Sequence, residues 1–265
     1  MLSITAGLAF IPWFGRRLGL PSKLNYLVAA GSSICGVTAI SALAPAIKAN
    51  EQETAFAVAN VVAFGTLNML LLPYVAHALL PTSQQAGMFL GLAVHDTAQV
   101  VGSALTYSQL FNDDLAMQTA VVTKLTRNVF LAAAIPGLAF MHAREQARTQ
   151  ANVTLPSLAQ AMPVFVVGFL GMAALRTAGD MTVVQQGWLA AEQWQQAIRV
   201  VGNEIGGHYC LGTAMAAVGL STQLSSLRGV GPKPFVLGLA GATVVGTTGF
   251  MAAMATPAVA AWLAG

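Results

Sequence analysis

Charged side chains are scarce in this sequence. Only 8% of the 265 residues are Asp, Glu, Lys or Arg, whereas about a quarter of the residues in an ordinary soluble domain are charged. Hydrophobic residues make up 56% of the chain, and the mean hydropathy is +0.68. This composition excludes the sandwich, barrel and doubly wound folds of soluble enzymes. It predicts an all-α polytopic membrane protein that lies in a lipid bilayer.

Cysteines and enzyme motifs are equally sparse. The two cysteines, Cys35 and Cys210, both fall in apolar segments and form no metal-ligand or CxxC pattern. No nucleophile elbow, phosphate loop or dinucleotide fingerprint occurs in a suitable context. The net charge of +3 is too small and too dispersed to suggest nucleic acid. We therefore expect no enzyme activity, no metal, no cofactor and no nucleic-acid partner.

Long apolar runs, in contrast, recur along the whole chain, and a run of about twenty residues can cross a bilayer as a helix. No linker or low-complexity tract separates these runs, so we expect a single membrane domain over residues 1–265. The stretch from Met181 to Val201 is too polar to span and is expected to lie at the membrane interface, where Trp is favoured. The sequence predicts eight segments: Met1 to Phe14, Tyr26 to Ile47, Thr54 to Leu80, Gln85 to Tyr107, Leu115 to Met141, Pro156 to Leu175, Ile205 to Leu224 and Phe235 to Leu263.

The few charges outside these segments divide unevenly between the two sides of the membrane. If the eight segments alternate in direction, one side collects seven bases and one acid, and the other collects three bases and seven acids. Basic loops favour the cytoplasmic side. We therefore expect a bacterial-type or organellar inner membrane, with the basic loops toward the cytoplasm, matrix or stroma.

Small and polar residues interrupt the segment from Tyr26 to Ile47. Glycine permits unusual dihedrals, and hydroxyls can satisfy freed backbone groups, so the composition fits a helix that breaks and exposes amides to an anion. Packing of small residues between helices explains it equally well. The candidate binding residues in this segment are Ser32, Ser33, Cys35, Gly36 and Thr38.

An acid and an imidazole lie in the middle of the segment from Gln85 to Tyr107. On a continuous helix, His95 and Gln99 share one face, with Asp96 beside them. An ionised Asp at the bilayer centre costs about 3 kcal/mol on insertion scales, so this face is expected to line a functional site. The alternative is an internal ion pair that only holds helices together.

The next segment contains two buried cations, Lys124 and Arg127, three residues apart. We expect Asp96 to neutralise one of them, which leaves a positive site that a small anion can occupy. Snorkelling of both cations toward one interface is the alternative. Because unsatisfied polar groups are costly in hydrocarbon, a break between Gly31 and Gly36 is expected to lie close to His95, Asp96 and at least one cation.

Several of these stretches, in this order, resemble a YeiH-type family of bacterial membrane proteins named for sulfate export. The resemblance implies a relative of the sodium/proton antiporter and bile-acid symporter superfamily, with inverted repeats and broken helices that cross near the midplane. It also implies secondary transport of a small anion of the sulfate or sulfonate type. The matching stretches are GSSICGVTAI from Gly31 to Ile40 with Pro45, Phe64 to Thr66 with Pro73 and Tyr74, His95 to Val101, Thr123 to Arg127, and Ala214 to Thr222 leading to Gly231 to Pro234.

The sequence departs from the family pattern before the GSSICG stretch, where members usually have several more helices. If Met1 is the true start, most of the first inverted repeat is missing, and the transporter fold is partial. This departure motivates an alternative function, namely a structural or accessory subunit that retains the fold within a larger membrane complex. The expected partners are then other membrane subunits or a second copy of the chain.

Overall fold

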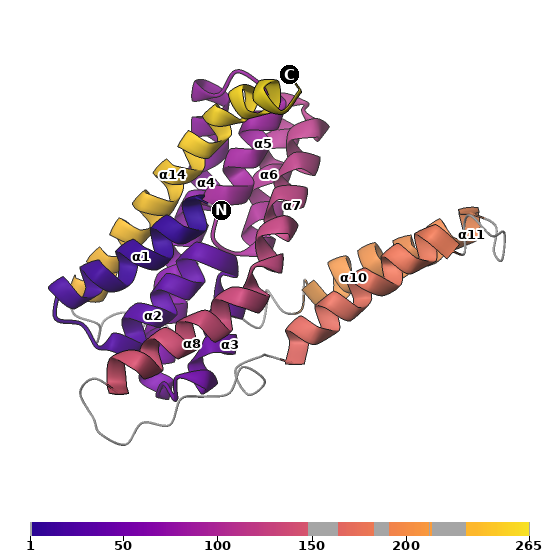
Figure 1. Cartoon of the computed structure of the whole chain (residues 1–265). Coiled ribbons are helices and arrows are strands. Elements are labelled where there is room, and N and C mark those ends of the chain that lie inside the picture. Colours follow the sequence, from indigo (N-terminus) through magenta and orange to yellow (C-terminus); the bar gives the residue numbers. More distant parts are fainter. Residues whose placement is uncertain (1, 148–163, 183–190, 212, 214–231, 265) are drawn as a thin grey trace. The chain divides into compact units, whose positions relative to one another are not determined.

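The computed structural model describes residues 2–147, 164–182, 191–211, 213 and 232–264 (Figure 1). These residues form helices and no strand, which confirms the all-α prediction for the described part of the chain. The chain divides into two compact units, Met1–Ala161 with Gln223–Gly265, and Met162–Thr222. The prediction of one membrane domain over residues 1–265 stays a prediction.

The first unit contains all the segments that carry the candidate site. Its elements are α1 (Leu2–Arg17), α2 (Ser22–Ala30), the π-helical segment η1 (Gly31–Cys35), α3 (Val37–Ala46), α4 (Glu51–Leu79), α5 (Ser83–Ala93), α6 (Thr97–Phe111), α7 (Asp114–Val129), α8 (Leu131–Ala147) and α14 (Pro232–Ala264).

Three of the predicted membrane segments are each divided into two or more helical pieces. The segment 26–47 becomes α2, η1 and α3, the segment 85–107 becomes α5 and α6, and the segment 115–141 becomes α7 and α8. Among the described residues, two helices are long and apolar enough to cross a bilayer unaided, Glu51–Leu79 and Pro232–Ala255. The total of eight spans stays a prediction, because 156–175 and 205–224 extend outside the described residues, as does the 214–222 motif.

The first break is fixed by backbone geometry at Gly36. Its amide donates to the carbonyl of Gly31, five residues earlier, which closes the π-helical turn. Gly36 then adopts φ 71° and ψ −134°, a region that only glycine occupies readily. Of the two readings that the sequence left open, the broken helix is confirmed for this segment.

Close helix packing holds the pieces of the first unit together. A side chain at Gly91 of α5 would lie 2.7 Å from the carbonyl oxygen of Ala120 of α7, so glycine lets these two helices approach closely. The buried core between α5, α6 and α7 includes Phe89, Leu90 and Val100. Helix α1 lies along α14 (Figure 1).

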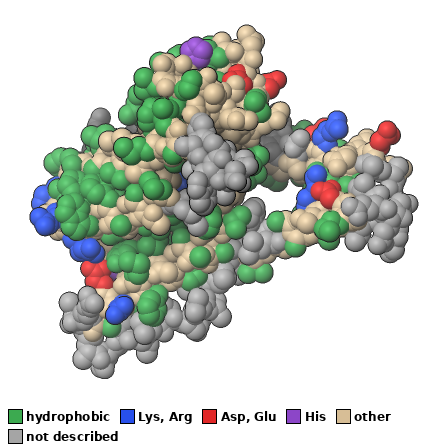
Figure 2. Space-filling view, turned by 45° about the horizontal axis from the view of Figure 1, so that its top comes forward, with side chains coloured by type: hydrophobic (Ala, Val, Ile, Leu, Met, Phe, Trp, Pro, Cys, Tyr) green, Lys and Arg blue, Asp and Glu red, His purple; other side chains and the backbone are tan. Residues whose placement is uncertain are grey.

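Hydrophobic side chains are exposed in several areas of the face that Figure 2 shows. On α4, Leu67, Leu70, Leu71 and Leu79 are exposed by 46–58%. A surface of this kind is too apolar for water but suits contact with lipid chains or with another membrane helix.

The second unit consists of α10 (Val164–Thr182), α11 (Ala191–Ile198) and the π-helical segment η2 (Arg199–Leu211). Asp180 accepts hydrogen bonds from Arg176 within α10 and from Trp194 of α11, both at 2.8 Å. This contact joins α10 to α11. Part of the stretch predicted to lie at the interface, residues 183–190, lies outside the described residues.

Candidate functional site

The breaks of two helices meet at one point in the first unit. The break between α5 and α6 contains His95 and Asp96, and the break between η1 and α3 contains Gly36. A side chain added at Gly36 would collide with the carboxylate of Asp96 and would lie 3.0 Å from its Cα atom. This contact confirms the prediction that the GSSICG break lies next to His95 and Asp96.

The place where the two helix breaks meet, at Gly36 and residues 95–96, is called the crossing. Lys124 of α7 is fully buried there. Its ammonium group donates to the carbonyl oxygens of Ile34, at 3.2 Å, and Val94, at 3.0 Å, and also to that of His95. The three donors of the ammonium group are thereby satisfied by backbone atoms from both breaks.

Arg127, one turn further along α7, is only 2% exposed. It binds backbone carbonyls near the same two helix breaks. Its Nε donates to Ser33 O at 2.9 Å, its Nη1 to Leu92 O at 2.6 Å and its Nη2 to Ser32 O at 3.1 Å. Together the two cations bind six carbonyl groups at the ends of η1 and α5. A helix C-terminus carries partial negative charge, so these carbonyls compensate both cations.

The predicted pairing of Asp96 with a cation is wrong. Neither Lys124 nor Arg127 forms an ion pair with it among the described residues. Asp96 is instead the N-cap of α6: its carboxylate accepts from the amide of Ala98 at 3.1 Å, while Gln99 Oε1 accepts from the amide of Asp96 at 3.3 Å. The two buried cations are satisfied by carbonyls instead, so neither snorkelling nor an ion pair describes them.

The continuous helical face expected for His95 and Gln99 is also wrong, because the chain is extended at Val94 and Asp96. His95 lies in the break, whereas Gln99 lies on the first turn of α6. The Gln99 amide donates to Val62 O at 3.3 Å and to Thr66 Oγ1 at 3.2 Å, both on α4. Gln99 therefore ties the start of α6 to α4.

The residues predicted in the GSSICG segment differ in burial and in whether they contribute to the site. Ser32 and Ser33 contribute their backbone carbonyls, while their hydroxyls face Gly241 of α14 and Gly7 of α1. Cys35 is buried. Thr38, the second residue of α3, is exposed, so its side chain does not join the cluster.

His95 has the least satisfied side chain at the crossing. It is fully buried, and neither ring nitrogen has a hydrogen-bond partner within the described part of the chain. Asn128 was not among the predicted site residues: its amide donates to Thr97 Oγ1 at 3.2 Å, and its oxygen is buried without a partner in the same part of the chain. Such groups are able to bind a polar ligand or water.

The break between α5 and α6 was also missed by sequence reasoning. A signal for it exists, because Asp96 followed three residues later by Gln99 has the form of a capping box, which marks a helix start. The carbonyl ligands of Leu92, Val94 and Ile34 gave no such signal, since the side chains of these residues are apolar.

The chain has relatives of known sequence. A UPF0324 membrane protein of Nitratidesulfovibrio vulgaris is 32% identical over 251 residues, which are 93% of this chain and 63% of that protein. One from Bordetella bronchiseptica is 34% identical over 229 residues, which are 84% of this chain and 64% of that protein. One from Ralstonia nicotianae is 32% identical over all of this chain and 70% of its own.

This chain therefore spans less than two thirds of the length of the first two relatives. No solved structure matches it. The match to the family described as "Conserved hypothetical protein 698" covers residues 1–238. The chain belongs to this YeiH-type family of membrane proteins.

Proposed function

We propose that this protein is a secondary transporter, or the transporter core of a longer one, for a small anion of the sulfate or sulfonate type. The observation that carries the proposal is the contact between two interrupted helices at Gly36 and Asp96. Discontinuous helices of this kind form the substrate sites of many secondary transporters, because their ends offer unpaired backbone groups inside the membrane.

The sign of the charge expected on the substrate follows from which helix ends already have a bound side chain. The carbonyl ends of η1 and α5 are bound by Lys124 and Arg127. The amide end of α3 has no side-chain cap. Helix N-termini attract anions, so the start of α3 is the natural place for a negatively charged group. The unpartnered ring of His95 supplies a further polar contact.

Asp96 is the proposed coupling group. Its carboxylate lies against Gly36, at the position where an anion would approach the start of α3. An ionised Asp96 competes with that anion by like-charge repulsion, and a protonated Asp96 does not. Uptake of the anion together with a proton is the expected coupling.

The proposed location is a bacterial-type or organellar inner membrane with the basic loops toward the cytoplasm. The loop near Glu51, predicted on the side opposite Arg16, lies on the side of Arg16 instead, because Lys23 donates to the carbonyl oxygen of Lys48 at 2.7 Å. Single cysteines introduced near Arg16 and near Asp113 should react with a membrane-impermeant reagent from opposite sides. Equal reactivity of both positions from one side contradicts this orientation.

Flux measurements in liposomes test the transport proposal directly. The purified protein is reconstituted and offered sulfate, sulfite, taurine-like sulfonates and carboxylates under an imposed proton gradient. Saturable uptake of at least one anion is expected. Absence of flux for all of them, in a folded sample, overturns the proposal. Stoichiometric co-migration with a large complex during native sizing then supports the accessory-subunit alternative.

Replacing Asp96 with Asn separates the proposed coupling role of its charge from its structural role as the N-cap of α6. The Asn side chain can still accept from Ala98 N, and Asn caps helices as well as Asp does, so stability should change by less than about 0.5 kcal/mol. Proton-driven uptake should fall to background. Asp113→Asn is the matched control, because Asp113 caps α7 through Ala116 N at 3.0 Å and lies outside the two breaks. Wild-type uptake by Asp96→Asn removes Asp96 from the coupling role.

A further inference from the structure

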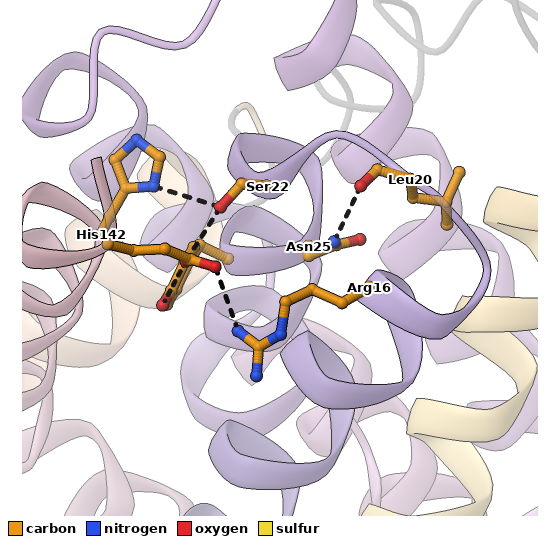
Figure 3. A network of polar contacts seen from close by, with 7 residues as sticks. Arg16, Leu20, Ser22, Asn25 and His142 are labelled. Atoms are coloured by element: carbon orange, nitrogen blue, oxygen red, sulfur yellow. Dashed lines mark hydrogen bonds and ion pairs between the residues drawn. The ribbon is translucent and has the colours of Figure 1, made fainter. Parts of the chain in front are cut away.

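A second polar cluster lies where the end of α8 packs against α1 and α2 (Figure 3). The carboxylate of Glu145 on α8 accepts from the hydroxyls of Ser22 and Tyr26 on α2, both at 3.1 Å. The guanidinium of Arg16, at the end of α1, lies 3.5 Å from the other carboxylate oxygen. Glu145 is therefore the centre of the contact between these three helices.

His142 lies one turn before Glu145 and is 3% exposed. Its Nδ1 is 3.5 Å from Ser22 Oγ (Figure 3). Its ring and that of Tyr26 form an edge-to-face contact, with 5.4 Å between centroids and 73° between planes. Its Nε2 is buried and has no hydrogen-bond partner among the described residues.

These contacts assign the tautomer of the neutral His142 ring. Since Ser22 donates its hydrogen to Glu145, its oxygen is left to accept from His142, which places the ring hydrogen on Nδ1. The buried Nε2 then carries only a lone pair. Protonation would add an N–H group and a positive charge where the described residues offer no acceptor, and this is costly.

The surrounding charged groups shift the pKa of His142 in both directions. Burial lowers the pKa of His142 below its ordinary value of 6.5; Glu145 and, from α4, Glu53 oppose this shift, while Lys23 of α2 adds to it. On the other elements packed against α8, Arg16 of α1 is bound to Glu145, Val37–Ala46 of α3 contains no titratable side chain, and Lys124 and Arg127 of α7 are bound by carbonyls.

We propose that His142 is a proton-sensitive latch, which holds the end of α8 against α2 only while its imidazole is neutral. A docked pKa below the ordinary value means that docking is complete well above pH 6.5. Docking is lost as the pH falls from 6.5 toward the lowered value. The latch itself does not depend on transport.

The latch has a consequence for the crossing, which rests on the proposed function. Helix α8 follows α7 after the single residue Phe130, and α7 carries the two cations that bind the breaks. Release of α8 should loosen α7 at the crossing. Acidification on the side of Arg16 and Arg144, which lie in the last turns of α1 and α8, should therefore slow transport.

Hydrogen–deuterium exchange of the whole protein in detergent tests the latch. Because the pKa of the docked imidazole lies below its ordinary value of 6.5, lowering the pH from 7.5 to 5.5 should raise exchange in α8, by up to about tenfold after correction for intrinsic rates. His142→Phe, which cannot be protonated, should remove this pH dependence. If that variant does not fold, His142→Gln takes its place.

The control is His77→Phe, because His77 is exposed on α4 and stacks on Phe111 at 3.7 Å, away from α8. This variant should keep the wild-type pH dependence in α8. Wild-type exchange in α8 that does not rise at pH 5.5, or an equal rise in the non-titrating variants, overturns the latch. Absence of flux at every pH, with the exchange result intact, counts against the proposed function alone.

Discussion

Replacing Lys124 with Met should produce one of the largest losses of stability in this protein. Met keeps the length and the apolar stem of Lys but removes the ammonium group that binds the carbonyls of Ile34, Val94 and His95. Removal of one partner of a buried charged interaction typically costs about 3 to 5 kcal/mol, and here it also leaves three buried acceptors without a donor.

Thermal unfolding in detergent measures this loss. Lys233→Met is the matched control, since Lys233 is exposed at the start of α14 and should tolerate the change. Arg127→Lys is an informative companion, because it keeps the charge but loses the planar donors that bind Ser32, Ser33 and Leu92. An unfolding midpoint for Lys124→Met equal to that of the control contradicts the role assigned to this side chain.

The second large effect is expected for Gly36→Ala. The positive φ of 71° strains any side chain, and the new Cβ would lie 2.9 Å from the Cβ of Asp96 and closer still to its carboxylate. Backbone strain and overpacking together cost roughly 2 to 6 kcal/mol. Relief requires the two breaks to separate, so the variant should lose transport even where it remains folded.

The matched control is Gly246→Ala on α14, where an added Cβ meets nothing within 4 Å. Stability and flux are measured for both variants in the same preparation. Gly246→Ala should keep both properties. Wild-type flux in Gly36→Ala would show that the contact between the breaks is not needed for transport.

The sequence was most informative where a polar residue conflicts with its surroundings. The small residues from Gly31 to Gly36 predicted a break, and the buried cations Lys124 and Arg127 predicted a site next to it, because both are costly in hydrocarbon unless satisfied. The structure bears out the break and its position beside His95 and Asp96.

The choice of partners could not be read from the sequence. Charge balance favoured Asp96 as the neutraliser of a cation, because such a balance includes ionised side chains but not the partial charges of the backbone. Carbonyl oxygens become available only where a helix ends, and the end of α5 was hidden within an apolar run. Because α5 ends at Ala93, Asp96 lies at the start of α6, where its carboxylate caps that helix by accepting from the amide of Ala98.

The carbonyl ligands of Lys124 and Arg127 have a consequence for the evolution of the family. A salt bridge between two side chains can be exchanged by paired substitutions, and such pairs leave a correlated signal in related sequences. Every type of amino acid supplies the same backbone carbonyl group, so the positions 32–34 and 92–95 can change their side chains without altering what the cations bind. Lys124 and Arg127 should therefore be nearly invariant across relatives and yet show no covarying partner position.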